Sequence, residues 1–179
     1  MTERLSKQDW LDHGLKTLAH SGFQGLKADL LCKSLEVSRG SFYWHFKNLK
    51  DFHLALLAHW KSVVTEATID DLNRHTDSSE QLAELMVRAF TMAPGLENAV
   101  RSWALHSAAV GQAVATVDTL RINYITKLLS DAGLPERQAC ARAVFVYAAS
   151  LGQSNIWSDN LKSLDKAAIG ELARILKSA

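Results

Sequence analysis

The sequence is poor in residues that cross-link or break a chain, with only two cysteines and two prolines among 179 residues. Cys32 and Cys140 lie far apart in helical patterns, which is typical of buried thiols in a reducing compartment rather than of a disulfide framework. The longest apolar run, AVFVYAA at 143–149, is well short of the roughly 18 residues that cross a bilayer. The N-terminus is polar, which argues against a secretory signal. These absences predict a compact cytoplasmic protein.

An excess of charge of one sign is also missing, since 20 Lys or Arg face 19 Asp or Glu and the formal net charge is +1. A chain that binds nucleic acid along its whole length would be more basic. The charge is nevertheless uneven, because residues 1–50 carry eight Lys or Arg against five Asp or Glu, and the rest carry twelve against fourteen. A basic N-terminal module on a slightly acidic body is compatible with DNA contact at one end only.

The motifs of common metal sites and enzymes are missing as well. Seven histidines are present, but no Cys/His pair has zinc spacing and no H-E-x-x-H occurs. There is no glycine-rich phosphate loop and no G-x-S-x-G, so nucleotide and acyl-transfer chemistry have no anchor. Asp118 and Arg121, three residues apart in a helical pattern, are expected to form a structural ion pair. We therefore expect no metal, no cofactor and no catalytic residues.

What the sequence does contain is helical periodicity, whereas strand signals are nearly absent. The periodicity predicts helices near 6–22 and 27–34, a third from Ser38 and a long fourth over 48–73. After the linker RHTDSSEQ (74–81) it predicts five more, near 82–93, 96–106, 108–131, 135–157 and 165–178. About nine helices without strands make an all-α protein. The predicted domains are 1–50, with the fourth helix as connector, and 51–179.

The stretch VSRGSFYWHF (37–46) concentrates aromatic rings in a short space. In a helix from Ser38, Phe42 and Phe46 share one face, and Arg39, Gly40, Tyr43 and Trp44 fall on the other. A short helix, the three-residue connection 35–37 and this second short helix have the layout of a helix-turn-helix DNA reader. The plainer alternative is a small apolar helix whose rings lie over a domain surface.

Residues 22–52, GFQGLKADLLCKSLEVSRGSFYWHFKNLKDF, resemble the N-terminal domain of TetR-family transcriptional regulators. The family pattern is matched by Val37, Ser38, Gly40, Ser41, Phe42, Tyr43, His45, Phe46 and Asn48. Glu36 stands where the turn usually has Gly, and Leu49 stands where the family has a phosphate-contacting Lys, with Lys50 one place later. The resemblance and the exposed face together predict contacts with double-stranded DNA from Lys27, Ser38, Arg39, Gly40, Ser41, Tyr43, Trp44, His45, Lys47 and Lys50.

Residues 100–133 are similar to the C-terminal half of one TetR subgroup, and residues 141–152 are similar to the helix that follows it. The resemblance implies a cavity for a small effector among the middle helices. Candidate pocket residues are Phe90, Met92, Trp103, His106, Tyr124, Tyr147, Gln153 and Trp157. It also implies a dimer built by the last two helices, for which the candidates are Ala139, Ala143, Val146, Ser150, Ser154, Ile169, Leu172 and Leu176. Ordinary packing within the chain is the alternative for this second set.

The predicted function is that of a homodimeric repressor, in which two recognition helices read a palindromic operator and an effector releases the DNA. The effector would move the long fourth helix and so change the separation of the recognition helices. Two alternatives stay open. One is a regulator of the same fold that a protein partner controls without a small ligand, and the other is an all-α enzyme.

Overall fold

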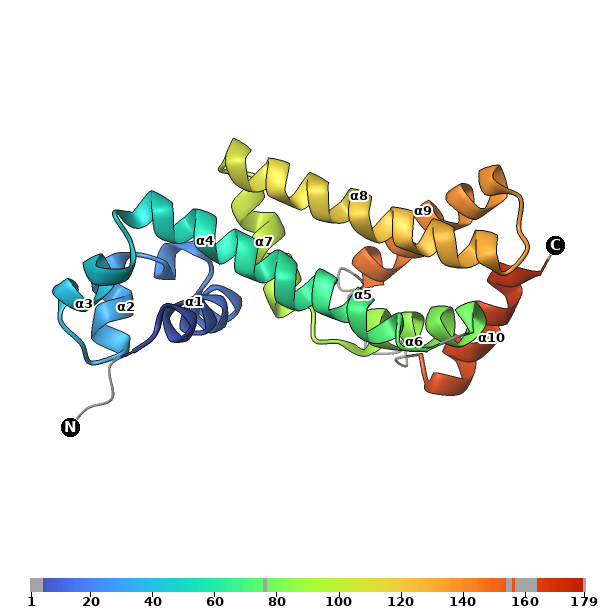
Figure 1. Cartoon of the computed structure of the whole chain (residues 1–179), viewed down its shortest axis with the longest axis horizontal. Helices are drawn as coiled ribbons and strands as arrows, with labels where there is room; N and C mark the ends of the chain where they lie inside the picture. Colours follow the sequence, from blue (N-terminus) through green and yellow to red (C-terminus); the bar gives the residue numbers. More distant parts are fainter. Residues whose placement is uncertain (1–4, 76, 154–155, 157–163, 179) are drawn as a thin grey trace. The chain divides into compact units, whose positions relative to one another are not determined.

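The computed structural model describes residues 5–75, 77–153, 156 and 164–178, and every regular element in this part of the chain is a helix (Figure 1). Ten α-helices are present there, and helices α4 and α5 are joined through one π-helical turn. If that run counts as one helix there are nine, so the all-α prediction is confirmed. In the described part of the chain, no helix is long and apolar enough to cross a membrane.

Contacts divide the chain into two compact units. The first unit consists of the residues up to Val64 together with Pro94–Ala115, and the second consists of Thr65–Ala93 together with the residues from Thr116 onward. Two of the three boundaries, after Val64 and after Ala115, lie inside helical runs, and the third, after Ala93, lies in the loop between α6 and α7. The predicted domain boundary at residue 50 stays a prediction about the DNA-binding module.

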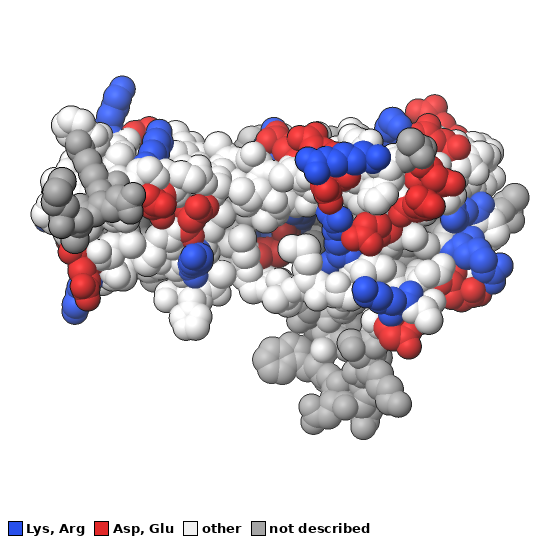
Figure 2. Space-filling view, turned by 60° about the horizontal axis from the view of Figure 1, so that its bottom comes forward, with Lys and Arg blue, Asp and Glu red and all other residues white. Residues whose placement is uncertain are grey.

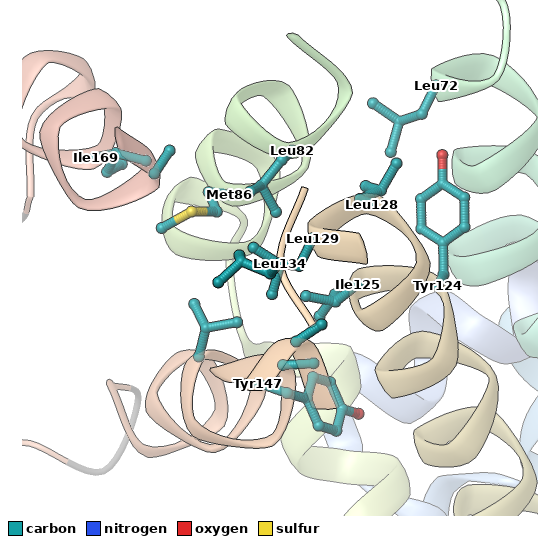
Figure 3. Packing of buried hydrophobic residues seen from close by; sticks show 14 of the residues in the cluster. Leu72, Leu82, Met86, Tyr124, Ile125, Leu128, Leu129, Leu134, Tyr147 and Ile169 are labelled. Atoms are coloured by element: carbon teal, nitrogen blue, oxygen red, sulfur yellow. The ribbon is translucent and has the colours of Figure 1, made fainter. Parts of the chain in front are cut away.

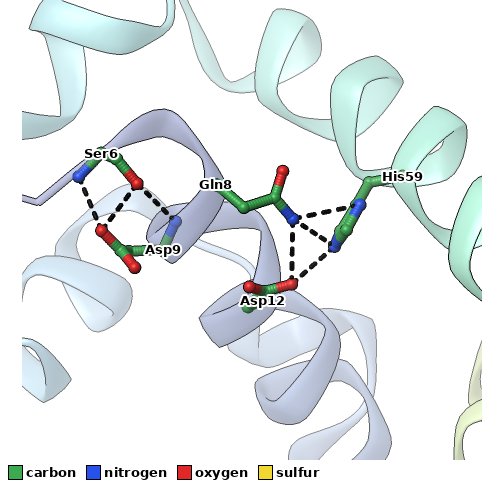
Figure 4. A network of polar contacts seen from close by, with 5 residues as sticks. All are labelled: Ser6, Gln8, Asp9, Asp12 and His59. Atoms are coloured by element: carbon green, nitrogen blue, oxygen red, sulfur yellow. Dashed lines mark hydrogen bonds and ion pairs between the residues drawn. The ribbon is translucent and has the colours of Figure 1, made fainter.

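The first unit contains α1 (Lys7–Ser21), a 3-10 turn (Phe23–Gly25), α2 (Ala28–Ser34), α3 (Arg39–His45), α4 (Leu49–Lys61) and α7 (Gly95–Ala104). Helix α1 starts where the sequence predicts, at a capping box: Asp9 N–H donates to Ser6 Oγ at 3.2 Å, and Ser6 N–H donates to Asp9 Oδ2 at 2.7 Å (Figure 4). It ends at Gly22, whose φ of 66° suits a glycine.

Helices α1 and α4 pack closely because Gly14 has no side chain. A Cβ at this position would lie 2.8 Å from Phe52 Cζ and 2.9 Å from Leu56 Cδ1, both closer than van der Waals contact. Further along the same pair of helices, His59 Nε2 lies 2.6 Å from Asp12 Oδ1 (Figure 4). Apolar packing and this polar contact together fix α4 against α1.

Helix α7 packs on α1 although it follows the whole of α6 in the sequence. The ring of Trp103 lies 4.9 Å from that of His53 in an edge-to-face contact, and the ring of His106 lies 5.7 Å from that of Phe23. Burial lowers the pKa of His53, which favours the neutral imidazole against the tryptophan ring. These aromatic contacts place α7 in the first unit.

The predicted helix over 48–73 is found with one irregularity. Its α4 segment ends at Lys61, a π-helical turn covers Ser62–Glu66, and α5 continues over Ala67–Leu72. Asn48 caps the start, because its side chain accepts the Asp51 N–H at 2.9 Å. A π-turn inserts one extra residue per turn and is often found at functional sites.

The second unit contains α5, α6 (Ser78–Thr91), α9 (Glu136–Gln153), α10 (Lys166–Lys177) and the part of α8 (Ala108–Asp131) from Thr116 onward. Its core is one apolar cluster (Figure 3). Fully buried members include Leu72, Leu82, Leu128, Leu129 and Ile169. On the face shown in Figure 2, acidic and basic side chains are interleaved over the surface of this unit. This arrangement agrees with the low net charge and gives no broad basic surface there.

Candidate nucleic-acid interface

Helix α3 is held against the first unit by the two phenylalanines that the sequence assigns to its inner face. Phe42 is fully buried and Phe46 is 1% exposed. The Phe42 ring contacts those of Trp10 at 5.4 Å and Phe52 at 5.5 Å, and Phe46 lies edge to face with Phe52 at 5.0 Å. These rings fix the position and the rotation of α3, so the opposite face is presented to solvent in a defined orientation.

The turn between α2 and α3 contains the single non-glycine residue with positive φ in the described part of the chain, Glu36 at 55°. The turn is closed by the Val37 N–H, which donates to the Cys32 carbonyl at 3.0 Å, and by the Glu36 N–H, which donates to Lys33. A non-glycine residue in this conformation costs roughly 1–2 kcal/mol. Glutamate in place of the family's glycine therefore keeps the geometry of the turn but lowers the free energy of unfolding of the first unit.

The exposed face of α3 carries Arg39, Gly40, Tyr43 and Trp44. Trp44 is 68% exposed and Tyr43 is 48% exposed, which is unusual for such large rings. Gly40 has room around it, because a Cβ there would meet only Ser38 Oγ, at 3.6 Å. Packing within the chain thus does not require glycine at this position, whereas close approach of an external backbone would.

Arg39 has partners on this face. Its Nε lies 3.0 Å from Asp29 Oδ1 on α2, and its guanidinium carbon lies 5.9 Å from the centre of the Tyr43 ring. Sequence reasoning did not anticipate the pair with Asp29, which is ten residues earlier. The sequence indicated only that two short helices follow one another. Which side chains meet across the turn depends on the angle between these helices.

Most of the other predicted DNA-contacting residues are at the surface. Lys27, Ser38, Lys47 and Lys50 are exposed, and Ser41 is half-buried. His45 is half-buried, and its Nε2 lies 2.9 Å from the Leu5 carbonyl oxygen at the start of α1. Its ring thus connects α3 to the N-terminal end of α1, which is a structural role. The roles of these residues in DNA contact stay predictions.

Comparison with known proteins bears on this region. The family described as "Bacterial regulatory proteins, tetR family" matches residues 11–56, which include α2, the turn and α3. The chain is 38% identical over 53 residues to the transcriptional regulator AcuR of Cereibacter sphaeroides, a segment that covers 30% of this chain and 24% of AcuR. Residues 11–56 therefore resemble the N-terminal domain of TetR-family regulators. The matched segment spans only about a quarter of the curated relative, so the sequence match concerns about a third of this chain.

Solved structures extend the likeness in fold to the whole chain. The regulator FadR of Bacillus subtilis, solved in complex with stearoyl-CoA, superposes with a TM-score of 0.66 at 18% identity and covers 97% of this chain and 98% of its own. A putative regulator of Saccharomonospora viridis, solved in complex with choline, superposes with a TM-score of 0.71 at 11% identity and covers 94% and 93%. At these identities the likeness establishes the fold of this chain and nothing finer.

The predicted effector-pocket residues do not form one cluster. Phe90, Tyr124 and Tyr147 lie in the core of the second unit, and Gln153 donates to the Phe90 carbonyl at 2.9 Å. Met92 is 62% exposed. The remaining residues lie elsewhere, since Trp103 and His106 belong to the first unit and Trp157 is outside the described residues.

A polar network is present within the second unit where the sequence predicts only an ion pair between Asp118 and Arg121. The Tyr147 hydroxyl donates to Asp118 Oδ1 at 2.7 Å. Arg121 donates through Nη1 to the Tyr147 oxygen at 3.3 Å and through Nε to Thr65 Oγ1 at 3.0 Å. Thr65 is 2% exposed and belongs to the π-helical turn. Burial, with the Asp118 contact assisting, raises the pKa of Tyr147 to about 12, so its hydroxyl stays a donor.

The stripe of small residues on α9 faces inward, so four of the eight predicted dimer-interface residues pack within the chain. Ala139, Ala143 and Ile169 have no exposed surface and Val146 is 7% exposed, all within the apolar core. Side chains that the chain itself covers cannot contact a second copy. Of the other predicted members, Ser150 donates to the Tyr147 carbonyl, Leu172 is exposed, Leu176 is half-buried, and Ser154 is outside the described residues. For the buried members of this set, the alternative of ordinary packing within the chain agrees with the structure.

The opposite face of α9 is apolar as well. Phe145 is 72% exposed and Val144 is 47% exposed, and on α10 Ile175 is 52% exposed. An all-round apolar helix has one face in its own core and another that is typically covered in an assembly.

Within the described residues, no group of three or more His, Cys, Asp or Glu side chains could hold a metal ion.

Proposed function

We propose that this protein is a DNA-binding transcriptional regulator of the cytoplasm, and specifically a homodimeric repressor of a palindromic operator. The observation that carries the proposal is the two-sided α3. Phe42 and Phe46 fix the helix on a packed aromatic base, while Arg39, Gly40 and Tyr43 are turned to solvent. A rigid helix that presents a cation, a phenolic hydroxyl and an exposed glycine fits a DNA major groove.

The contacts in this proposal divide by chemistry. Arg39 can donate two hydrogen bonds to guanine O6 and N7, which would specify a base. Tyr43 and Ser41 can donate to phosphate oxygens, and the exposed Lys47 and Lys50 supply charge toward the backbone. Trp44 offers a large apolar surface beside this set. Phosphate contacts would set orientation and affinity, and Arg39 would set much of the base preference.

For the dimer we propose the exposed face of α9 and α10, with Phe145, Val144 and Ile175 at its centre. A two-fold interface buries the same patch on both copies, so one apolar patch is sufficient. A two-fold dimer would also place two helix-turn-helix modules on two half-sites, so one small module per protomer is sufficient for a specific operator.

For the effector we propose a small molecule that binds in the second unit, where Tyr147, Asp118 and Arg121 supply hydrogen-bonding groups beside an apolar core. The support from related folds is limited to the fact that FadR and the Saccharomonospora viridis protein were solved with stearoyl-CoA and choline. An effector shifts DNA affinity only if it binds one arrangement of the protein more tightly than the other. The regulator would then release its operator at effector concentrations that saturate the tighter arrangement.

A regulator controlled by a protein partner is the second candidate, because the exposed apolar face of α9 and α10 could also receive another protein. The oligomeric state separates the two. A stable dimer in the absence of other proteins assigns this face to a second copy, whereas a monomer leaves it for a partner.

The deciding experiment is a gel-shift titration against the duplex DNA that flanks the protein's own gene, with a scrambled duplex of the same composition as control. We expect binding that is tighter to the flanking DNA by a factor of about 10³ or more, and that weakens steeply with salt on both duplexes. Equal affinity for the two duplexes, or no binding at low salt, would remove the regulator assignment.

A further inference from the structure

The proposed DNA contacts of Arg39 do not explain why its side chain pairs with Asp29. Asp29 lies in the first turn of α2 and Arg39 is the first residue of α3, so their side chains meet across the two helices of the reader. The two side chains are 66% and 64% exposed, so both stay accessible to DNA. The Tyr43 ring lies on a second side of the guanidinium. Arg39 is therefore oriented by two neighbours before DNA arrives.

The nitrogen that Asp29 engages decides what the contact can do. The carboxylate lies 3.0 Å from Nε, the nitrogen nearest the side-chain stem. The two terminal amino groups, which form the parallel pair of hydrogen bonds to guanine O6 and N7, point away from that nitrogen. A contact at a terminal amino group would compete with guanine, whereas the contact at Nε holds the guanidinium by the nitrogen that this pair of hydrogen bonds does not use.

A mobile arginine side chain loses rotamer entropy when it binds a base. A guanidinium group that is already oriented therefore discriminates better between guanine and the other bases. The aspartate has an opposite effect on overall affinity, because a carboxylate beside the phosphate backbone weakens binding to every duplex. The two effects act on different quantities: the first on the ratio between right and wrong bases, the second on all sequences alike.

We propose that Asp29 is a positioning residue that sets Arg39 for guanine recognition, and that it thereby raises sequence specificity at the expense of overall affinity. This inference rests on the proposed DNA-binding function. The DNA feature that Arg39 would recognise is one G·C pair in each half-site, contacted in the major groove.

The test uses an operator duplex selected from a randomised library with the wild-type protein. Each G·C pair of this duplex is then replaced in turn, and dissociation constants are measured for the full-length wild type, Arg39→Ala, Asp29→Asn and Asp29→Glu. We expect Arg39→Ala to abolish discrimination at one symmetric position, a loss of roughly 5- to 100-fold. At that same position Asp29→Asn should lose about two- to fivefold, in keeping with an exposed pair, and Asp29→Glu should recover part of the loss.

Glu36→Gln is the matched control. Glu36 is an exposed carboxylate in the adjoining turn, and it makes no ion pair within the described part of the chain. Its replacement changes the net charge by the same amount as Asp29→Asn. We expect both variants to bind a scrambled duplex slightly more tightly, and only Asp29→Asn to lose discrimination. Thermal melting of each variant confirms that the fold is retained.

The outcomes separate this inference from the function on which it rests. If the wild type selects no operator, the DNA-reader function itself is refuted. If the wild type selects one and Asp29→Asn behaves as Glu36→Gln does at every position, the positioning role is refuted and Asp29 is only a repulsive charge. A loss of discrimination that Asp29→Asn shows equally at all positions also overturns it, because a positioned Arg39 reads a single pair.

Discussion

Tyr147 on α9 donates its phenolic hydrogen to Asp118 on α8 over 2.7 Å, within the interior of the second unit. Arg121, one turn further along α8, donates to the same phenolic oxygen. The hydroxyl is therefore held by an acid and a base from one helix. Only the protonated phenol of Tyr147 can donate to Asp118 while its oxygen accepts from Arg121.

The stability of the second unit should fall at high pH because of Tyr147. Its pKa is raised from 10.0 to about 12, mainly by burial, so folding favours the protonated phenol. The corresponding stability is fully present below pH 10 and is lost as pH rises through about 12. Denaturant unfolding across this range should show the loss in the wild type and in Tyr43→Phe, whose ring is at the surface, and a smaller loss in Tyr147→Phe. An equal loss in all three would exclude Tyr147 as the source.

Gly14 and Gly40 should respond in opposite ways to alanine. Gly14→Ala places a methyl 2.8 Å from Phe52, so it should destabilise the first unit by about 1–3 kcal/mol despite a better helix propensity. Gly40→Ala meets open space and should be neutral or stabilising by up to about 1 kcal/mol. Its added methyl nevertheless faces the proposed DNA and should weaken operator binding. Denaturant unfolding and gel-shift titration of both variants check the contrast, which fails if Gly40→Ala binds as tightly as the wild type.

Glu36→Gly should stabilise the protein. Glycine removes the strain of the positive φ at this position, and its greater freedom in the unfolded chain cancels part of the gain. We expect a net increase of about 0.5–1 kcal/mol in the free energy of unfolding. Lys33→Gly, in the neighbouring helix α2, is the control and should destabilise by about 1 kcal/mol. A loss of stability in Glu36→Gly would show that the turn carries no strain.

Arg39 and Lys50 should differ in what they contribute to DNA binding. Arg39→Ala should relax base preference, because it removes the proposed base contact. Lys50→Ala should weaken matched and scrambled duplexes alike and lower the slope of log K against log salt by about one. Titrations of both variants at several salt concentrations measure the two effects. The opposite pattern would reverse the assignment of base and phosphate contacts.

Phe145→Glu should yield a monomer. The substitution places a charge at the centre of the exposed apolar face of α9, so pairing two copies would bury two like charges. Analytical ultracentrifugation should show the wild type as a dimer and the variant as a monomer, with the melting temperature of the monomer fold little changed. The variant should also bind a full palindrome no better than a half-site. Dimers of unchanged stability would place the interface elsewhere.

The comparison of sequence with structure shows which features are local. The capping box at Ser6 and Asp9, the asparagine cap at Asn48 and the two-faced α3 all follow from spacings of a few residues, and the structure contains each of them. Helical periodicity is a local property too, which is why the all-α class could be predicted. The resemblance in residues 22–52 lies in the same local pattern, and the family match over residues 11–56 confirms it for this segment.

Features that depend on distant parts of the chain could not be predicted in the same way. The apolar stripe of α9 was recognised, but Ala139 and Ala143 turned out to face the chain's own core, because periodicity shows that a face is buried and not what buries it. Trp103 is a candidate pocket residue by sequence, and its contact with His53 and its place in the first unit depend on tertiary packing. The Arg39–Asp29 pair likewise depends on how two short helices cross.

The sequence by itself determined the helices, their caps, the inner and outer faces of α3 and the TetR resemblance of the N-terminal segment. Each of these features rests on hydrogen bonds and side-chain spacings within one or two turns. Only the tertiary structure decided which helices share a unit, which carboxylate orients Arg39 and which face of α9 is left exposed. Those outcomes depend on packing between residues that are distant in sequence, where many pairings satisfy the same pattern and close fit selects one.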